Sequence, residues 1–169
     1  MLTRSMAMKG LPYFTVGKVV KGFGRGSKDL GIPTANFPDE VVNDLPEDIG
    51  TGVYYGWATV DNGPVHKMVM SIGWNPYFKN SKKSMETHIL HAFGTDFYGS
   101  QLRICIIGYV RPEMDFWTLD DLITTIKNDI DTANRQLDTA EMKAFKDHAF
   151  FQSEIIDNKI VNGNTYYIN

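Results

Sequence analysis

A glycine-rich, basic loop from Gly22 to Lys28 could do chemistry, and it leads into the segment Pro33-Thr34-Ala35-Asn36. The backbone amides of such a loop, together with a lysine, can hold the phosphates of a nucleotide. The loop fits neither the Walker pattern Gly-x-x-x-x-Gly-Lys nor the dinucleotide pattern Gly-x-Gly-x-x-Gly. Gly31 and Pro33 would interrupt a following helix, so any phosphate is held by loop amides. A flexible hairpin with solvated charges is the alternative that the loop leaves open.

Two oxygen-bearing side chains follow the loop. In an extended segment residues two apart share a face, so Thr34 and Asn36 point the same way. A hydroxyl and an amide oxygen suit a hard cation such as Mg²⁺, which takes few protein ligands and completes its shell with phosphates and water. The segment therefore predicts a divalent-cation site at Thr34 and Asn36.

The stretch from Ser84 to His91 carries a carboxylate and two histidines, and it admits three interpretations. A zinc site from Glu86, His88 and His91 is disfavoured, because the two histidines have opposite parity on a strand and no cysteine joins them. A surface ion pair of Glu86 beside half-buried histidines is the structural alternative. The third interpretation makes Glu86 a general base for phosphoryl transfer, with the metal at Thr34 and Asn36 and with Lys28 as the cation.

Composition bounds the classes of function. The chain has 169 residues, 43% of them hydrophobic, and a formal net charge of -3. This is enough for one buried core, and the negative charge argues against a general binder of nucleic acid or membrane surfaces. Cys105 is the only cysteine, so no intramolecular disulfide can form, and its apolar neighbours predict a buried, inert thiol. We expect a monomeric, cytoplasmic protein.

The elements that must position these residues are mainly strands. Alternating and β-branched residues bounded by turns predict about six strands in successive hairpins, which is typical of an antiparallel barrel or sandwich. Five of the segments are clear: 13–20, 52–60, 65–72, 84–93 and 101–110.

Helices are expected only late in the chain. From Thr118 apolar residues recur every three and four positions as far as Leu137, which predicts an amphipathic helix packed on the strands, with Thr118 as its N-cap. A shorter helix is expected within 141–148. We expect residues 1–11 to be a frayed leader and 12–151 to be the folded domain, and we leave the tail at 152–169 unassigned.

Six motifs in the same order resemble eukaryotic riboflavin kinase. They are GFGRGSK at 22–28, GIPTANFP at 31–38, TGVYYGWA at 51–58, SIGWNP at 71–76, METHI at 85–89 and FYG at 97–99. Each motif alone is weak, but they occur in the same order, and the resemblance covers roughly residues 12–151. The resemblance implies a mainly β fold, a six-stranded antiparallel Greek-key β-barrel with C-terminal α-helices packed against it.

The resemblance also implies an activity and a site. The riboflavin 5′-hydroxyl would attack the γ-phosphate of ATP to give FMN and ADP, with Glu86 as the catalytic base and the metal at Thr34 and Asn36. The metal would be Mg²⁺ or another divalent ion such as Zn²⁺. The nucleotide would be covered by a flap of Gly22, Gly24, Arg25, Gly26, Ser27 and Lys28. Its adenine would lie near Ile89, His91 and Tyr98, and the flavin would lie near Arg111, Met114 and Phe116.

The main rival is a flavin- or nucleotide-binding barrel that performs no chemistry. Both hypotheses explain the aromatic residues and the loop, but only the kinase explains a carboxylate placed near paired metal-ligand types. Bacterial relatives of this kinase are commonly fused to an adenylyltransferase that makes FAD. The chain has no His-x-Gly-His motif and no room for that domain, so we expect one activity.

Overall fold

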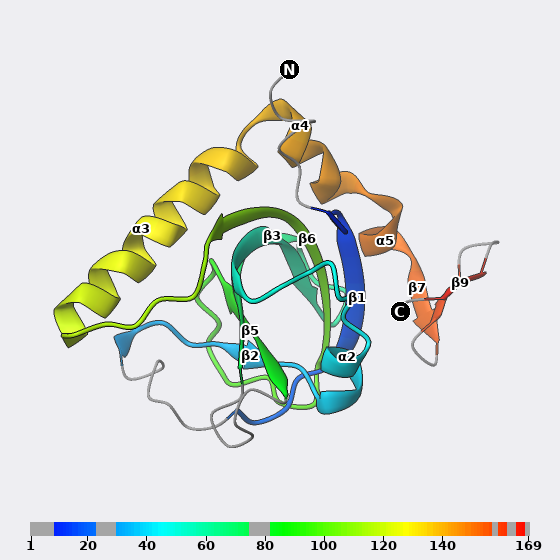
Figure 1. Ribbon diagram of the computed structural model, residues 1–169. Coiled ribbons are helices and arrows are strands. Elements are labelled where there is room, and N and C mark those ends of the chain that lie inside the picture. Colours follow the sequence, from blue (N-terminus) through cyan, green and yellow to red (C-terminus); the bar gives the residue numbers. More distant parts are fainter. Residues whose placement is uncertain (1–8, 23–29, 75–81, 157–158, 162–164, 168–169) are drawn as a thin grey trace.

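Six antiparallel strands form one strongly curved sheet in the computed structural model, which describes residues 9–22, 30–74, 82–156, 159–161 and 165–167, with side chains described as far as Ser153 (Figure 1). The order across the sheet is β1-β6-β3-β4-β5-β2. A backbone bridge between Val20 and Asn36 links the two end strands, so the sheet curls into a half-barrel. The strands are β1 (Tyr13–Lys18), β2 (Ala35–Asn36), β3 (Gly52–Val60), β4 (His66–Trp74), β5 (Lys83–Ile89) and β6 (Gln101–Arg111).

The connections make a Greek key. Strands β3, β4 and β5 pair in succession, and β6 crosses back to lie beside β3. This is the order that defines the motif. The predicted six-stranded antiparallel Greek-key fold is therefore confirmed, although β5 ends at Ile89 and does not reach the predicted Phe93.

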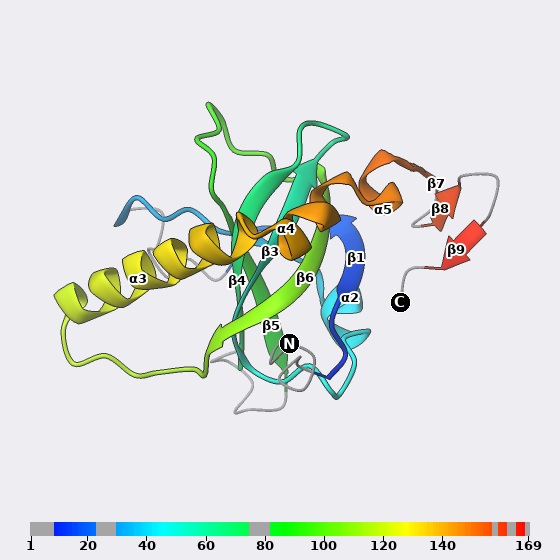
Figure 2. The ribbon, with the colours of Figure 1, turned by 90° about the horizontal axis from the view of Figure 1, so that it is seen from above.

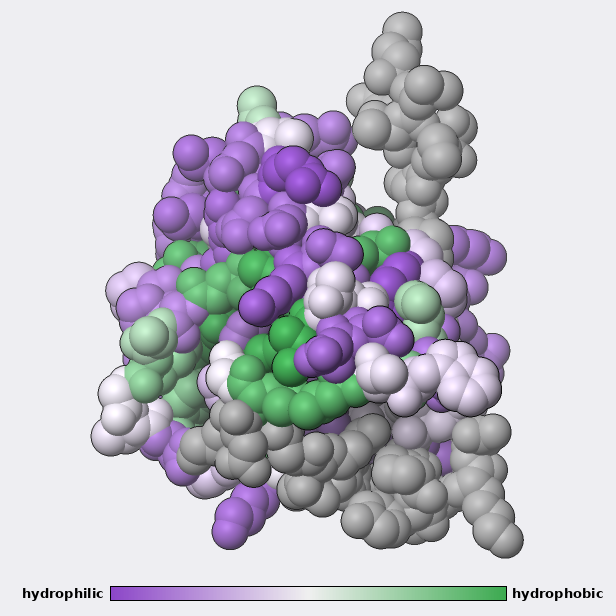
Figure 3. All heavy atoms as spheres, turned by 90° about the vertical axis from the view of Figure 1, so that its left-hand side faces the viewer, coloured by the Kyte–Doolittle hydropathy of each residue, from purple (hydrophilic) through white to green (hydrophobic). Residues whose placement is uncertain are grey.

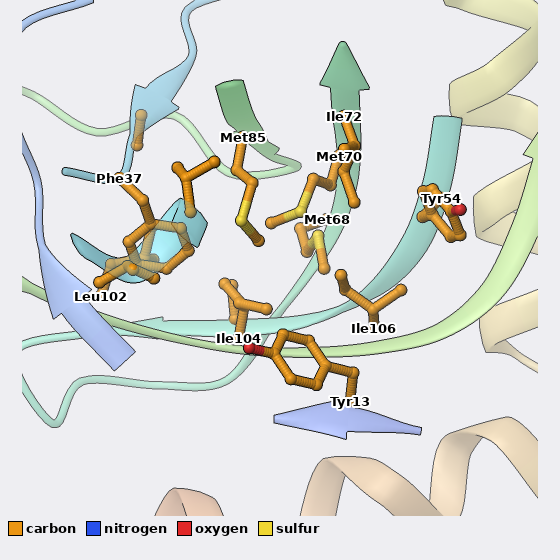
Figure 4. Close-up of a cluster of buried hydrophobic side chains, with 14 of the residues drawn as sticks. Tyr13, Phe37, Tyr54, Met68, Met70, Ile72, Met85, Leu102, Ile104 and Ile106 are labelled. Carbon is orange, nitrogen blue, oxygen red and sulfur yellow. The ribbon is translucent and has the colours of Figure 1, made fainter. Parts of the chain in front are cut away.

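Alternation along the strands fills the interior of the half-barrel. Met68, Met70 and Ile72 of β4 are fully buried and point inward together with Met85 of β5 and Ile104 of β6 (Figure 4). Residues between them in the sequence therefore lie on the outer face of the sheet. This parity decides which side chains of β4, β5 and β2 are available for a site.

The C-terminal helices cover part of that outer face. They are α3 (Leu119–Leu137), α4 (Ala140–Lys143), a 3₁₀ helix (Ala144–Asp147) and α5 (Ala149–Gln152). Trp57, Cys105, Leu137 and Phe150 belong to a second apolar cluster between the sheet and these helices. Burial raises the pKa of the Cys105 thiol, as expected for an inert cysteine.

The long helix begins where the sequence predicts. The Thr118 hydroxyl accepts a hydrogen bond from the Asp121 amide at 3.1 Å, which satisfies one of the first free N–H groups of α3. The C-terminal half of α3 is tied to β4 by Lys67, whose Nζ lies 2.8 Å from Asp138 Oδ1. Its N-terminal half extends beyond the edge of the sheet (Figure 2).

Two regions lie outside the elements assigned from the sequence. A short helix, α2 (Asp39–Asn43), follows β2 and packs Val41 and Val42 into the interior. The tail forms a separate three-stranded sheet of β7 (Glu154–Ile156), β8 (Lys159–Val161) and β9 (Thr165–Tyr167). No helix in the described parts of the chain is both long and apolar enough to cross a membrane.

Candidate functional site

Strand pairing brings Glu86 and Asn36 together. Glu86 of β5 pairs directly with Asn36 of β2 on one side and with Ser71 of β4 on the other, both antiparallel. Directly opposed residues project from the same face of a sheet, with Cβ atoms about 4.5–5.5 Å apart. Ala35 and Met85 belong to the interior, so the three polar side chains lie in a row on the outer face.

The Asn36 side chain is buried and has a free acceptor. Asn36 is 8% exposed, and its Oδ1 atom has no hydrogen-bond partner among the described residues. A buried amide oxygen without a partner is unusual and calls for an explanation. A cation or a ligand donor at this oxygen would supply one.

Gly22 lies directly over the Asn36 amide. A Cβ atom on residue 22 would stand 2.3 Å from Asn36 Nδ2, so a side chain here would displace the amide. This close approach explains the first glycine of the sequence motif. The rest of the predicted flap, from Gly24 to Lys28, lies outside the described residues.

A cavity of about 280 Å³ adjoins Asn36. Its lining includes Lys21 and Lys83, which sequence reasoning did not select because neither lies in a motif. The Lys83 ammonium also lies 5.5 Å from the centroid of the Trp74 ring. The lining also includes the Asp39 carboxylate, so the two lysines leave it with a net positive charge, the sign that attracts a phosphate group.

His88 connects the strand of Glu86 to the segment that carries Thr34. Its Nδ1 lies 2.7 Å from the carbonyl oxygen of Pro33, and because a carbonyl only accepts, Nδ1 donates the proton. The bond holds the Pro33–Thr34 peptide beside β5. Thr34 itself is half-buried and precedes Asn36 by two residues, so the expected pairing of their side chains on one face is compatible with the backbone.

The predicted adenine residues are less closely grouped. Ile89 packs into the interior core, whereas Tyr98 is 51% exposed. The His91 amide donates to the Ile89 carbonyl at 2.8 Å, so the chain leaves the strand there. His91 therefore lies beyond the end of β5 and does not share a strand face with Ile89.

His91 instead stacks on a second histidine. Its ring centroid lies 4.1 Å from that of His66, and Phe93 packs edge-on against His91 at 4.8 Å. Burial lowers the pKa of His66, and the neighbouring His91 and Lys146 lower it further. The aromatic group of His66, His91 and Phe93 was missed because His66 is 25 residues away in sequence on β4.

No zinc cluster is formed in the described part of the chain. No group of three or more His, Cys, Asp or Glu side chains in it could hold a metal ion. His88 is bonded to the Pro33 carbonyl and His91 stacks on His66. The zinc interpretation of the Ser84 to His91 stretch has no support in this geometry.

The predicted flavin residues lie around the loop between β6 and α3. Arg111 ends β6, and its Nε and Nη2 atoms both donate to the Asp129 carboxylate of α3 at 2.9 Å. Its Nη1 donates to the Pro112 carbonyl, and its guanidinium lies 5.8 Å from the Phe116 ring. The guanidinium is thus committed to holding the helix and the loop, a role that sequence reasoning missed.

A second cavity, of about 300 Å³, lies between this loop and α3. Met114 and Phe116 line it together with Trp117, Asp121, Thr124 and Thr125. Trp117 is 98% exposed, an unusual position for so large an aromatic side chain. On the face that Figure 3 shows, apolar surface lies in the middle, with polar side chains above it.

Comparison with known proteins identifies relatives over the whole barrel. The family model described as "Flavokinase: Riboflavin kinase" matches residues 9–137. A riboflavin kinase from Mus musculus is 60% identical over 156 residues, covering 92% of this chain and 99% of the relative. The human riboflavin kinase is 59% identical with the same coverage. The crystal structure of a riboflavin kinase from Trypanosoma brucei superposes with a TM-score of 0.70 at 31% identity, covering 86% of this chain and 92% of that one.

Proposed function

Because the chain belongs to the riboflavin kinase family, we propose that it catalyses ATP-dependent phosphorylation of riboflavin, giving FMN and ADP. The observation that carries a catalytic rather than a merely binding role is the row on the outer face. It sets the Glu86 carboxylate beside Asn36, whose buried amide oxygen has no hydrogen-bond partner in the described parts of the chain. A passive binder has no need of this pair.

Glu86 acts as the general base in this proposal. The riboflavin 5′-hydroxyl oxygen forms a bond to the γ-phosphorus of ATP as the bond to the β,γ-bridging oxygen breaks and ADP leaves. The hydroxyl proton passes to the Glu86 carboxylate, which releases it to solvent after FMN departs. Phosphoryl transfer of this kind depends mainly on positioning and on electrostatic stabilisation of the phosphate oxygens.

Thr34 and Asn36 are suited to hold a divalent cation. A hydroxyl and an unpartnered amide oxygen are hard donors of the kind Mg²⁺ prefers. A bound cation would neutralise charge on the β- and γ-phosphates. Lys21 and Lys83, which line the cavity beside Asn36, add positive charge from the protein.

The two substrates bind on either side of Glu86 in this proposal. We assign the adenine to Ile89, His91 and Tyr98, of which His91 belongs to the aromatic group with His66 and Phe93. We assign the flavin to the cavity lined by Met114 and Phe116, with Arg111 holding the loop. The reacting groups then meet at Glu86.

Three further expectations belong to the same proposal. We propose that residues 12–151 form the catalytic domain, that the enzyme is monomeric, and that it acts in the cytoplasm. The last rests on its single, buried cysteine, which is typical of a reducing compartment. Sedimentation of the purified protein and fractionation of cells test the second and third.

A reconstitution assay tests the activity directly. Purified protein is incubated with riboflavin, ATP and MgCl₂, and FMN is quantified by chromatography, with each component omitted in turn. A kinase forms FMN only in the complete mixture and releases one ADP per FMN. Riboflavin or ATP binding without FMN formation would establish the passive binder instead.

A further inference from the structure

Glu113 lies against the bare backbone of Gly73. It is the second residue of the loop that follows β6, and its Oε1 atom is 2.5 Å from the position that a Cβ atom on residue 73 would take. The carboxylate therefore occupies the space that any side chain at position 73 would need. A glycine on β4 creates the seat for an acidic side chain from a different part of the chain.

Strand register puts this seat next to Glu86. Ser71 pairs with Glu86, and Gly73 pairs with Ser84. Ile72, between them, points into the interior, so Gly73 faces the same outer side as Ser71 and Glu86. Diagonal neighbours on such a face are about 7–8 Å apart, which is the separation expected between Gly73 and Glu86.

The loop connects the same carboxylate to the second cavity. Glu113 immediately precedes Met114, which lines that cavity together with Phe116. Glu113 is exposed, so a ligand can reach it. It stands between the cavity assigned to the flavin ring and the carboxylate assigned to the 5′-hydroxyl.

Building on the proposed function, we propose that Glu113 binds the ribityl hydroxyls of riboflavin. A ribityl chain must span the distance from the ring to the reacting hydroxyl, and it carries secondary hydroxyls that need acceptors. A carboxylate accepts from two hydroxyls at once through charge-assisted hydrogen bonds. Glu113 thereby distinguishes a flavin with a polyhydroxylated chain from one without it.

Binding of two flavins to a Glu113→Ala variant tests the assignment. Lumiflavin has the riboflavin ring but a methyl group in place of the ribityl chain, and flavin fluorescence reports its binding without any chemistry. We expect the variant to bind riboflavin at least about tenfold more weakly, because each lost hydrogen bond to a charged group weakens binding by about 10- to 150-fold. Lumiflavin affinity should not change. Equal loss for both flavins, or loss for neither, would overturn the proposal.

Gly73→Ala provides an independent test of the seat. The new methyl group would collide only with the flexible end of the Glu113 side chain, so the fold should tolerate it. We expect Gly73→Ala to weaken riboflavin binding as much as Glu113→Ala does, and to have no further effect in the Glu113→Ala background. If Gly73→Ala lowers riboflavin affinity as much in the Glu113→Ala background as in the parent, Gly73 does not act by making room for the Glu113 carboxylate, and this part of the proposal fails.

Two controls separate this inference from the proposed function. Asp131→Ala removes an exposed carboxylate of α3 and should leave both affinities unchanged. Riboflavin binding by the unsubstituted protein must precede the comparison. If that protein binds no riboflavin, the proposed function fails; if it binds riboflavin but Glu113 does not matter, only the present inference fails.

Discussion

Glu86 and Asn36 face each other across a ladder of backbone hydrogen bonds, whereas Met114 and Phe116 lie on a loop that side chains hold from a distance. The first pair is fixed by the register of β2 and β5. The loop depends on the bond from Arg111 to Asp129, 18 residues further along the chain. The half of the candidate site that we assign to the phosphates is therefore built by the sheet, and the half that we assign to the flavin is built by the packing of α3.

This difference has consequences for substitutions. A side chain on a ladder can be changed with little effect on its neighbours, because the backbone holds the geometry. A loop held by one buried ion pair loses its geometry when either residue of the pair is replaced. Substitutions on the strands should change the catalytic rate and leave the free energy of unfolding nearly constant. Substitutions that affect the loop should change both activity and the free energy of unfolding.

Glu86→Gln is expected to have the largest effect on turnover. The amide keeps the shape of the side chain but cannot accept the hydroxyl proton, and a general base contributes about 10²–10⁴-fold. We expect kcat to fall by that factor while riboflavin and ADP still bind and the thermal midpoint is unchanged. Glu47→Gln, on an exposed loop, is the matched control. FMN formation by Glu86→Gln at the parent rate would remove Glu86 from the mechanism.

Asp129→Ala should disrupt the flavin half. It leaves the half-buried Arg111 guanidinium without its carboxylate, and loss of one partner of such a pair costs about 3 kcal/mol or more. Asp129 is 5% exposed, so water can replace the carboxylate only in part. Chemical denaturation measures the loss of stability. We expect the KM for riboflavin to rise more than the KM for ATP.

A double variant separates two roles of Arg111. Replacing the pair with apolar residues, Arg111→Met with Asp129→Leu, should restore most of the stability, because no buried charge remains unpaired. If Arg111 only positions the loop, riboflavin affinity recovers together with stability. If Arg111 also contacts the flavin, stability recovers and affinity does not.

Substitutions at Thr34 and His88 should change the metal requirement. Thr34→Val removes a proposed ligand, so it should raise the Mg²⁺ concentration for half-maximal activity more than a substitution of His88 does. His88→Leu removes only the bond to the Pro33 carbonyl, which contributes about 0.7 kcal/mol, or about threefold. His88→Asn is the matched control, because its amide can donate from nearly the position of Nδ1. A metal requirement unchanged in Thr34→Val would exclude that hydroxyl as a ligand.

His66 should give the smallest effect, a dependence of stability on pH. Its folded-state pKa is lowered by burial and by the neighbouring His91 and Lys146, so the unfolded chain binds the proton more readily. Its contribution is complete above the ordinary histidine pKa, near 6.5, and is lost as the pH falls from there through the lowered folded value. His66→Gln, compared with the parent in denaturant titrations at several pH values, should reduce this loss. Identical pH profiles would contradict the assignment.

Local patterns predicted most of the fold. The strand over 52–60 has the predicted bounds, and the long helix begins after its predicted cap, because alternation, periodicity and capping act within a few residues. The direct pairing of Asn36 with Glu86 could not be predicted, because alternation along a strand shows which face of the sheet a side chain occupies but not which strand lies beside it. The end of β5 was misplaced because no turn-forming residue such as glycine or proline stands at Leu90 or His91, immediately beyond the actual end of the strand.

The sequence alone determined the alternating strands and the amphipathic helix, because each depends on neighbours along the chain. Only the tertiary structure decided which side chains meet across it. It brought Arg111 to Asp129, His66 to His91 and Glu113 to Gly73. Such contacts depend on how the sheet curls and where α3 packs, and no spacing within a single element records that.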